Sequence, residues 1–218
     1  MRHALQNPPT KIALLDAAMR LMLAKSYTAT SVDEICQSAG VTKGSFFHYF
    51  KGKEDLGEAV LDHNWKVTHE KPLVAPSSNE TDPLKRLYAY IDRFIQISQD
   101  PQIPKSCLYG NLAQELSQTH PRITARCGRG FSEWAEEIKR DLDAAKARYV
   151  PKAALDTRSL AEHFIAVYEG SLILTKAKQD PSILADNMRH FKRYIEFLFG
   201  KAKRRRGDGY YGKTVAHD

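Results

Sequence analysis

The sequence predicts an all-α chain, with a small N-terminal helix-turn-helix unit followed by a larger helical domain. Two observations carry this prediction. Apolar residues recur three and four positions apart along most of the 218 residues, and no stretch of useful length alternates as a strand would. The segment Thr30–Lys53 also contains two helix-start signals separated by a glycine turn.

Charge and cysteine content narrow the class of protein. The formal net charge of +7 is compatible with a nucleic-acid partner, although residues 1–71 are nearly neutral and the excess collects in Lys201–Arg206. No apolar run is long enough to cross a membrane, and Met1–Pro9 lacks the apolar stretch of a signal peptide. Three widely spaced cysteines argue for reduced thiols rather than a disulfide scaffold or a zinc site. We therefore expect a cytoplasmic protein without a metal, a cofactor or a membrane contact.

The first helix is expected to begin after the proline-containing leader. Thr10 can serve as its N-cap, and apolar residues then follow at helical spacing until the helix ends near Lys25. This helix would hold the next two helices in place rather than read a partner itself, although its N-terminus can touch a phosphate. Its apolar positions are Ile12, Leu15, Met19, Met22 and Leu23.

The next two helices are short and closely spaced. Ser31 can cap the first, and Glu34 three positions later completes a capping box. Gly40 suits the left-handed position just past a helix end because it has no Cβ atom to clash. Thr42 can then cap a second helix, expected over Lys43–Tyr49. Two short helices joined by a glycine-containing turn form a helix-turn-helix, although generic helical hairpins share these signals.

The residues of this motif resemble the N-terminal signature of the TetR (tetracycline-repressor) family of transcriptional regulators. The resemblance covers about a quarter of the chain, from Lys11 to Trp65. It implies a homodimer that binds a double-stranded DNA operator of pseudo-palindromic sequence. The matching residues are Thr30, Ser31, Ile35, Ala39, Gly40, Val41, Thr42, Gly44, Ser45, Tyr49, Phe50 and Lys53.

The resemblance also assigns roles to individual residues of the motif. Lys43 and Ser45 are expected to reach base edges in the major groove, where Gly44 lets the backbone approach closely. Base contacts specify the sequence, whereas phosphate contacts position the protein. The residues expected at phosphates are Ser31, Thr42, Tyr49 and Lys53, with His48 able to contact either a base or a phosphate.

Three positions depart from the family pattern or from helix preferences. Ser26 stands where the family usually has glycine, so the helix end there must tolerate a Cβ atom or adopt another turn. Phe47 replaces a tyrosine whose hydroxyl would reach a phosphate. Lys53 lies at the start of the following helix, where a cation is unfavourable, which favours a phosphate contact over a local stabilising role.

A linking helix and a linker mark the expected domain boundary. The helix Glu54–His69 joins the motif to the rest of the chain, and Pro72–Pro83 has the composition of a linker. We expect a DNA-binding domain over residues 1–71 and an effector-binding and dimerisation domain over residues 72–200. Residues 201–218 form a basic tail, expected to be disordered, that either adds non-specific affinity for nucleic acid or only increases solubility.

The second domain is expected to consist of helices separated by proline-containing breaks. Its last helix repeats apolar residues in a heptad-like pattern, which predicts a seam packed against a second copy of the chain in a four-helix bundle. The seam residues are Leu184, Met188, Phe191, Ile195 and Leu198, with the apolar stripe from Leu160 to Ile173 beside them.

Two segments of this domain, Cys107–Ser117 and Tyr168–Leu172, resemble the regulatory half of a TetR subgroup that includes repressors of the N-ethylmaleimide-responsive type. The resemblance implies a small-molecule effector held among the helices. It also implies, as an alternative, an electrophile that reacts with Cys107, with Lys176 or His163 as neighbours that would favour the thiolate. Each candidate can also be an ordinary core residue. The candidates are Phe94, Cys107, Tyr109, Asn111, Glu115, Trp134, His163, Phe164 and Tyr168.

The functional alternatives differ in what fills the second domain. No phosphate-binding glycine loop, zinc-protease motif or nucleophile motif occurs, which argues against an enzyme. The main hypothesis is a TetR-like repressor that an effector releases from its operator. The alternative is a DNA-binding architectural protein without a small-molecule switch. Aromatic-lined space among the helices would favour the repressor, and a solid core would favour the architectural protein.

Overall fold

The computed structural model describes residues 8–69 and 80–200, and throughout these ranges the regular structure is helical, as the sequence predicts. The helices are α1 (Pro9–Lys25), α2 (Val32–Ala39), α3 (Lys43–Tyr49), α4 (Lys53–His69), α5 (Pro83–Gln99), α6 (Leu108–Leu116), α7 (Pro121–Tyr149), α8 (Thr157–Lys178) and α9 (Ser182–Leu198).

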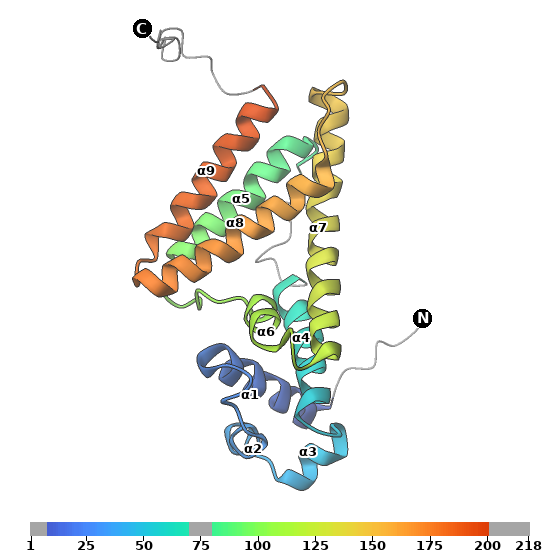
Figure 1. Cartoon of the computed structure of the whole chain (residues 1–218), viewed down its shortest axis with the longest axis vertical. Coiled ribbons are helices and arrows are strands. Elements are labelled where there is room, and N and C mark those ends of the chain that lie inside the picture. Colours follow the sequence, from blue (N-terminus) through green and yellow to red (C-terminus); the bar gives the residue numbers. More distant parts are fainter. Residues whose placement is uncertain (1–7, 70–79, 201–218) are drawn as a thin grey trace, which may run out of the picture.

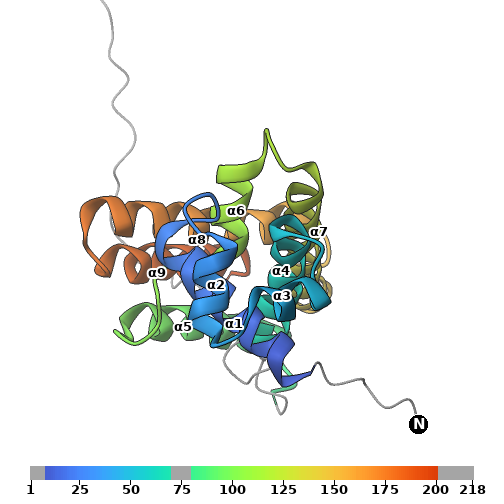
Figure 2. The same cartoon turned by 90° about the horizontal axis from the view of Figure 1, so that it is seen from below.

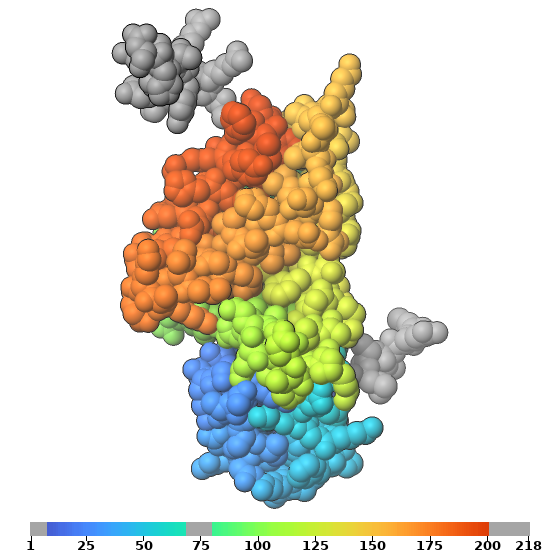
Figure 3. Space-filling view, in the orientation of Figure 1, coloured from blue at the N-terminus to red at the C-terminus, as the bar shows by residue number. Residues whose placement is uncertain are grey.

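The helices form an elongated molecule with the helix-turn-helix at one end (Figure 1). There, α1, α2 and α3 pack beside the first half of α4, and we call this group the N-terminal unit. The opposite end is formed by α5, α8 and α9, while the long α7 runs beside both parts. In the space-filling view, α6 and the start of α7 fill the region between the two ends (Figure 3).

Local signals set the helix ends of the motif as the sequence predicts. The Oγ of Ser31 accepts the N–H of Glu34 at 3.2 Å, while the Glu34 carboxylate accepts the N–H of Ser31 at 2.9 Å, which completes the capping box. Gly40 has a φ of +67°, the left-handed conformation expected at that helix end. The prediction for α1 is wrong in one respect, since the helix already begins at Pro9 and Thr10 does not cap it. Proline suits a first helical position because no partner exists there for an N–H.

Two groups of buried side chains hold the molecule together. The first joins α1–α4 to α6 and the start of α7, with Phe46 and Leu112 both fully buried. The second fills the space among α5, α7, α8 and α9 around the buried Phe164. Trp65 packs against both groups. By packing, α6 therefore belongs with the N-terminal unit, although it follows the expected boundary in the sequence.

The heptad-like seam of α9 does not form a contact surface for a second copy of the chain, contrary to the prediction. Its residues are buried inside the same chain, where α9 packs against α5 and α8. The apolar period identifies a buried helix face, but it does not specify which element covers that face. The buried seam residues are Leu184, Met188, Phe191 and Ile195, with Leu198 partly buried beside them.

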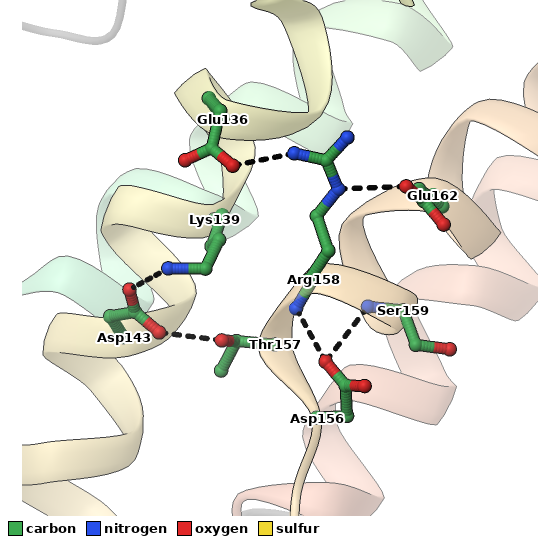
Figure 4. Close-up of polar contacts among 8 residues, drawn as sticks. All are labelled: Glu136, Lys139, Asp143, Asp156, Thr157, Arg158, Ser159 and Glu162. Carbon is green, nitrogen blue, oxygen red and sulfur yellow. Dashed lines mark hydrogen bonds and ion pairs between the residues drawn. The ribbon is translucent and has the colours of Figure 1, made fainter. Parts of the chain in front are cut away.

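A polar cluster fastens the start of α8 to α7 (Figure 4). Asp156 caps α8 by accepting two of its first backbone N–H groups. The Arg158 guanidinium bridges Glu136 of α7 and Glu162 of α8, and Asp143 of α7 accepts the hydroxyl of the first residue of α8. These contacts fix the position of α8 across the upper part of α7.

In the part of the chain that the structure describes, every helix is too short or too polar to cross a membrane. The expected linker lies mostly, and the basic tail entirely, outside the described residues. On either side of the linker, α4 ends at His69 and α5 begins at Pro83, with Asp82 as its N-cap.

Candidate nucleic-acid interface and ligand cavity

The helix-turn-helix places α3 at the lower end of the molecule (Figure 1), so that it faces the viewer when the molecule is seen from below (Figure 2). Thr42 caps α3 because its Oγ1 accepts the N–H of Ser45 at 3.1 Å, and the hydroxyls of these two residues also lie 3.1 Å apart. Phe46 and Phe50 are buried beneath the helix and fix its inner face against the core of the N-terminal unit. The outer face of α3 is therefore free to meet a partner.

Lys43 and Gly44 open α3, and both are exposed. The Lys43 ammonium pairs with Asp33 of α2 at 2.7 Å, and this contact raises the pKa of Lys43. An ion pair as exposed as this one contributes little stability, so an acceptor on DNA can replace Asp33 at small cost. A Cβ atom at Gly44 would touch only Thr42 Oγ1 at 3.6 Å, so the fold of the free protein does not require glycine there.

The rest of this surface combines polar groups with one large apolar side chain. Ser31 and His48 are exposed, and Tyr49 is half-buried with its ring edge-on to His48. Phe47 is 58% exposed, and its ring forms a T-shaped contact with that of Phe46, with the centroids 5.1 Å apart. An exposed phenylalanine can contact a thymine methyl group, but it cannot donate a hydrogen bond to a phosphate. The surface thus offers both hydrogen-bonding groups and an apolar side chain, the two kinds of contact that base edges in a DNA groove can accept.

Lys53 has a local role that the sequence did not indicate. Its ammonium donates to the carbonyl oxygens of Tyr27 and Thr30, at 3.2 and 3.1 Å, and lies 4.4 Å from the centre of the Tyr27 ring. These acceptors compensate for the unfavourable position of a cation at the first residue of α4. The argument that preferred a phosphate contact over a local stabilising role is therefore wrong, because the structure shows that local role. Because an ammonium has three donors, one stays available for a phosphate.

A cavity of about 290 Å³ lies between the N-terminal unit and the far end of the molecule. Helices α1 and α4–α8 line it, mainly with apolar and aromatic side chains. Phe94, Trp134 and Tyr168 form one wall, with ring centroids 5.0 to 6.0 Å apart. Both tryptophans of the chain, Trp65 and Trp134, contribute to the lining. A cavity of this size and lining suits a small apolar or aromatic molecule.

The cavity contacts the helix that leads to the N-terminal unit. Four side chains between Asn64 and Thr68, in the last part of α4, line it. From the α6 side, the Tyr109 hydroxyl donates to the Leu61 carbonyl of α4 at 2.9 Å. On α7, a Cβ atom at Gly130 would lie 2.1 Å from the Tyr109 ring, so only glycine allows this close approach. An occupant that displaced Tyr109 would therefore act directly on α4.

The structure brings together five of the nine residues predicted for an effector site. Phe164 lies just behind them, with its ring 5.2 Å from that of Phe94. Sequence reasoning missed Trp65 and Phe131, because helical spacing predicts only that both face inward and cannot separate a core aromatic from one beside a cavity. The five predicted residues in the lining are Phe94, Cys107, Tyr109, Trp134 and Tyr168.

The other three candidates lie outside the cavity lining. Asn111 is hydrogen-bonded to Ser106 and Lys176 at the surface. His163 contacts aromatic rings of α9. The Glu115 carboxylate accepts two backbone N–H groups just beyond the end of α1. Each of these three side chains therefore makes contacts within the protein instead of facing the cavity.

Cys107 lines the cavity, but its surroundings favour the thiol over the thiolate. Burial raises the pKa of Cys107 well above its usual value, and the neighbouring Glu169 carboxylate adds to this shift. Gly110 makes room for that carboxylate, because a Cβ atom there would lie 2.1 Å from Glu169 Oε2. The expectation that Lys176 or His163 favours a Cys107 thiolate is therefore wrong, since the ionisable side chain that acts on this thiol is an acid.

Comparison with known sequences gives two family matches, one on each side of the segment between α4 and α5. The family described as bacterial regulatory proteins, tetR family, matches residues 14–60, and the tetracyclin repressor-like C-terminal domain matches residues 83–191. An HTH-type transcriptional regulator in the lacX 3′ region of Lactococcus lactis subsp. lactis is 29% identical over 187 residues, which cover 86% of this chain and 93% of the relative. The HTH-type transcriptional repressor NemR of Escherichia coli K12 is 24% identical, with 85% and 94% of the two chains covered.

Solved structures share the arrangement of helices. The crystal structure of the regulatory protein TetR from Rhodobacter sphaeroides is 26% identical, with a TM-score of 0.72 over 86% of this chain and 99% of that chain. A TetR transcriptional regulator from Chloroflexus aurantiacus is 24% identical, with a TM-score of 0.75 over 85% and 93% of the two chains. The order of a helix-turn-helix unit and a larger helical domain is therefore common to these proteins.

Proposed function

This chain belongs to the TetR family of DNA-binding transcriptional regulators, and we propose that it is a repressor whose DNA affinity falls when a small apolar or aromatic molecule occupies its cavity. The observation that carries the proposal is the position of the cavity against the last part of α4. The other end of α4 packs in the N-terminal unit beside α3 (Figure 1). One helix therefore contacts both the cavity and the DNA-binding motif, as a coupling element must.

In this proposal α3 enters the major groove as the reading helix. Lys43 and Ser45 contact base edges, and Gly44 lets the backbone approach the duplex. The exposed positions of Lys43 and Gly44 and the partial exposure of Ser45 support the assignment, as does the weakly held ion pair that Lys43 can exchange for a base or phosphate. Phosphate contacts are assigned to Ser31, Thr42, Tyr49 and Lys53, with His48 contacting either a base or a phosphate.

The active form is proposed to be a homodimer that presents two reading helices to one duplex. Apolar side chains exposed on α8 and α9 support this proposal, because a second copy packed against them would remove them from water. A two-fold symmetric dimer requires a pseudo-palindromic operator. The residues assigned to this interface are Ile173, Leu174, Tyr194 and Phe197, the last 72% exposed.

The same proposal divides the chain by role. Residues 1–71 bind DNA, and residues 72–200 sense the effector and dimerise, with α6 as the part of the second domain that packs on the first. Aromatic-lined space among the helices supports a sensor over an architectural protein with a solid core. Reaction of an electrophile with Cys107 ranks second as an input, because burial and Glu169 keep this thiol protonated.

Selection of duplexes from a random library with the full-length protein tests the proposed function. The enriched duplexes should carry two related half-sites about one helical turn apart. Lys43→Ala should weaken binding to them by about 1–3 kcal/mol and relax the preference at one base pair of each half-site. Lys85→Ala, in the first turn of α5, a helix of the opposite end of the molecule, is the control and should change neither property. Failure to enrich any duplex, or enrichment of a single unrepeated site, would overturn the proposal.

A further inference from the structure

The Glu115 carboxylate connects α6 to the end of α1. It accepts the N–H of Tyr27 at 2.9 Å and the N–H of Thr28 at 2.7 Å. The side chains of Thr28 and Ser26 also favour the charged form of the same carboxylate. Burial alone would raise the pKa of Glu115, but these hydrogen bonds outweigh it and lower the pKa below its usual value. The group is therefore ionised at neutral pH and fully engaged by the turn that follows α1.

The turn held by Glu115 contains a strained residue. Ser26 has a φ of +81° and a ψ of +165°, a conformation that glycine adopts readily and residues with a Cβ atom rarely do. Such a conformation persists only where the surroundings impose it. Here the Glu115 carboxylate binds N–H groups of the turn, while the Lys53 ammonium binds two of its carbonyl groups. A carboxylate therefore holds the N–H groups of this turn, and an ammonium group holds its carbonyl groups.

This turn sets where α2 begins. Thr30 is fully buried, and its hydroxyl donates to the Ser26 carbonyl at 2.7 Å. The next residue, Ser31, is the N-cap of α2. Helix α2 continues into α3 through the short turn at Gly40, so a displacement of the turn after α1 also displaces the reading helix.

Helix α6 carries Glu115 near one end and lines the cavity at the other. Cys107, Leu108 and Tyr109 contribute to the cavity lining, and Tyr109 lies about 9 Å along the helix from Glu115. We propose that Glu115 is a positioning residue for DNA binding: it holds the strained turn in the DNA-binding conformation, and a shift of α6 at the cavity loosens this hold. The cavity is thus connected to the DNA-binding motif through α6 and Glu115 as well as through α4. This inference rests on the proposed DNA-binding function.

A double-mutant cycle with the full-length protein and a duplex enriched by the native protein tests this role. Glu115→Ala should weaken binding at least about tenfold, because only a fraction of the molecules then keeps the turn in place. Its oligomeric state in sedimentation should not change. Ser26→Gly should raise the melting temperature and leave DNA affinity near the native value. The double variant should regain most of the lost affinity, because glycine adopts the turn without strain.

Two further variants sharpen the test. Gln114→Ala changes the neighbouring exposed position of α6 and should leave DNA affinity unchanged. Glu115→Gln removes the charge but keeps one acceptor oxygen, so it should lose less DNA affinity than Glu115→Ala. If the alanine variant does not fold, Glu115→Gln takes its place in the double-mutant cycle with Ser26→Gly. A merely structural role predicts a lower melting temperature with unchanged affinity and no rescue by Ser26→Gly, and that result overturns the inference.

The outcomes also separate this inference from the proposed function. If the native protein enriches no duplex, the proposed function fails and the inference fails with it. If the native protein binds its duplex and both Glu115 variants bind equally well, the proposed function stands and only the positioning role of Glu115 is overturned.

Discussion

Replacing Gly130 of α7 with alanine is expected to destabilise the protein through the cavity wall. The added Cβ atom would lie 2.1 Å from Cε1 and 2.6 Å from Cδ1 of Tyr109, whereas ordinary contacts begin near 3.4 Å. The ring must therefore move away from α7. Overpacking of this kind costs about 1–3 kcal/mol in free energy of unfolding.

Movement of the Tyr109 ring has a second cost. Its hydroxyl would lose the hydrogen bond to the Leu61 carbonyl of α4, which contributes about 0.5–1.5 kcal/mol. Alanine is preferred over glycine within a helix by about 0.5–1 kcal/mol, which offsets part of the loss. The net destabilisation is centred on about 2 kcal/mol within a range of about 0.5–4 kcal/mol, and the central value corresponds to a fall in melting temperature of roughly 4–8 °C for a chain of this size.

Gly128→Ala is the matched control because it lies on the same helix, and outside the neighbouring backbone of that helix the added Cβ would meet no atom of the described residues within 4 Å. This variant should be as stable as the native protein or more stable by up to about 1 kcal/mol. Urea and thermal unfolding, followed by circular dichroism, measure both variants. If Gly130→Ala proved as stable as Gly128→Ala, Tyr109 would not pack against α7 as described, and the proposed route from cavity to α4 would lose its basis.

Three further predictions concern the dimer, the thiols and the DNA surface. Phe197→Lys should yield a folded monomer in sedimentation velocity and weaken binding to a duplex with two half-sites; a dimer that persists at micromolar concentration would place the interface elsewhere. Because burial raises the pKa of Cys107, N-ethylmaleimide should modify it at pH 7 more slowly in the folded than in the urea-unfolded protein, as mass spectrometry would measure. Glu169→Gln should speed the modification of Cys107 and leave that of Cys127 unchanged, because burial is what raises the pKa of Cys127 to about 11. Equal rates of Cys107 modification in the folded and the unfolded protein would contradict a buried, protonated thiol at this position. Phe47→Tyr should restore a phosphate contact and strengthen binding to all duplexes alike by about 1 kcal/mol in DNA titrations, whereas a change confined to one base pair would indicate a base contact instead.

The helix-turn-helix could be predicted residue by residue because local chemistry determines it. The Ser31–Glu34 capping box and the left-handed Gly40 each depend on neighbours within four positions, and both occur where the sequence predicts them. The roles of Glu115 and Lys53 could not be predicted in this way. Both side chains bind backbone groups that are distant in the sequence, and backbone partners leave no trace in side-chain spacing.

The larger domain shows what periodicity does and does not predict. Apolar spacing in α9 correctly indicated a buried face, but it could not distinguish α5 of the same chain from a second copy. The cavity was predicted only in part for a related reason. A cavity forms where packing between crossing helices is incomplete, and the inward direction of Trp65 or Phe131 gives no information about such a gap.

Intrinsic fluorescence combined with DNA titration measures whether an occupant of the cavity lowers DNA affinity. Both tryptophans line the cavity, so a bound molecule should change their emission. A panel of small apolar and aromatic compounds is screened for this change, and each compound that produces it is added to the complex with the enriched duplex. We expect the same concentrations to lower DNA affinity by roughly 5- to 150-fold, a coupling of about 1–3 kcal/mol. A compound that saturates the fluorescence change and leaves DNA affinity unaltered would contradict the coupling between the cavity and the reading helix.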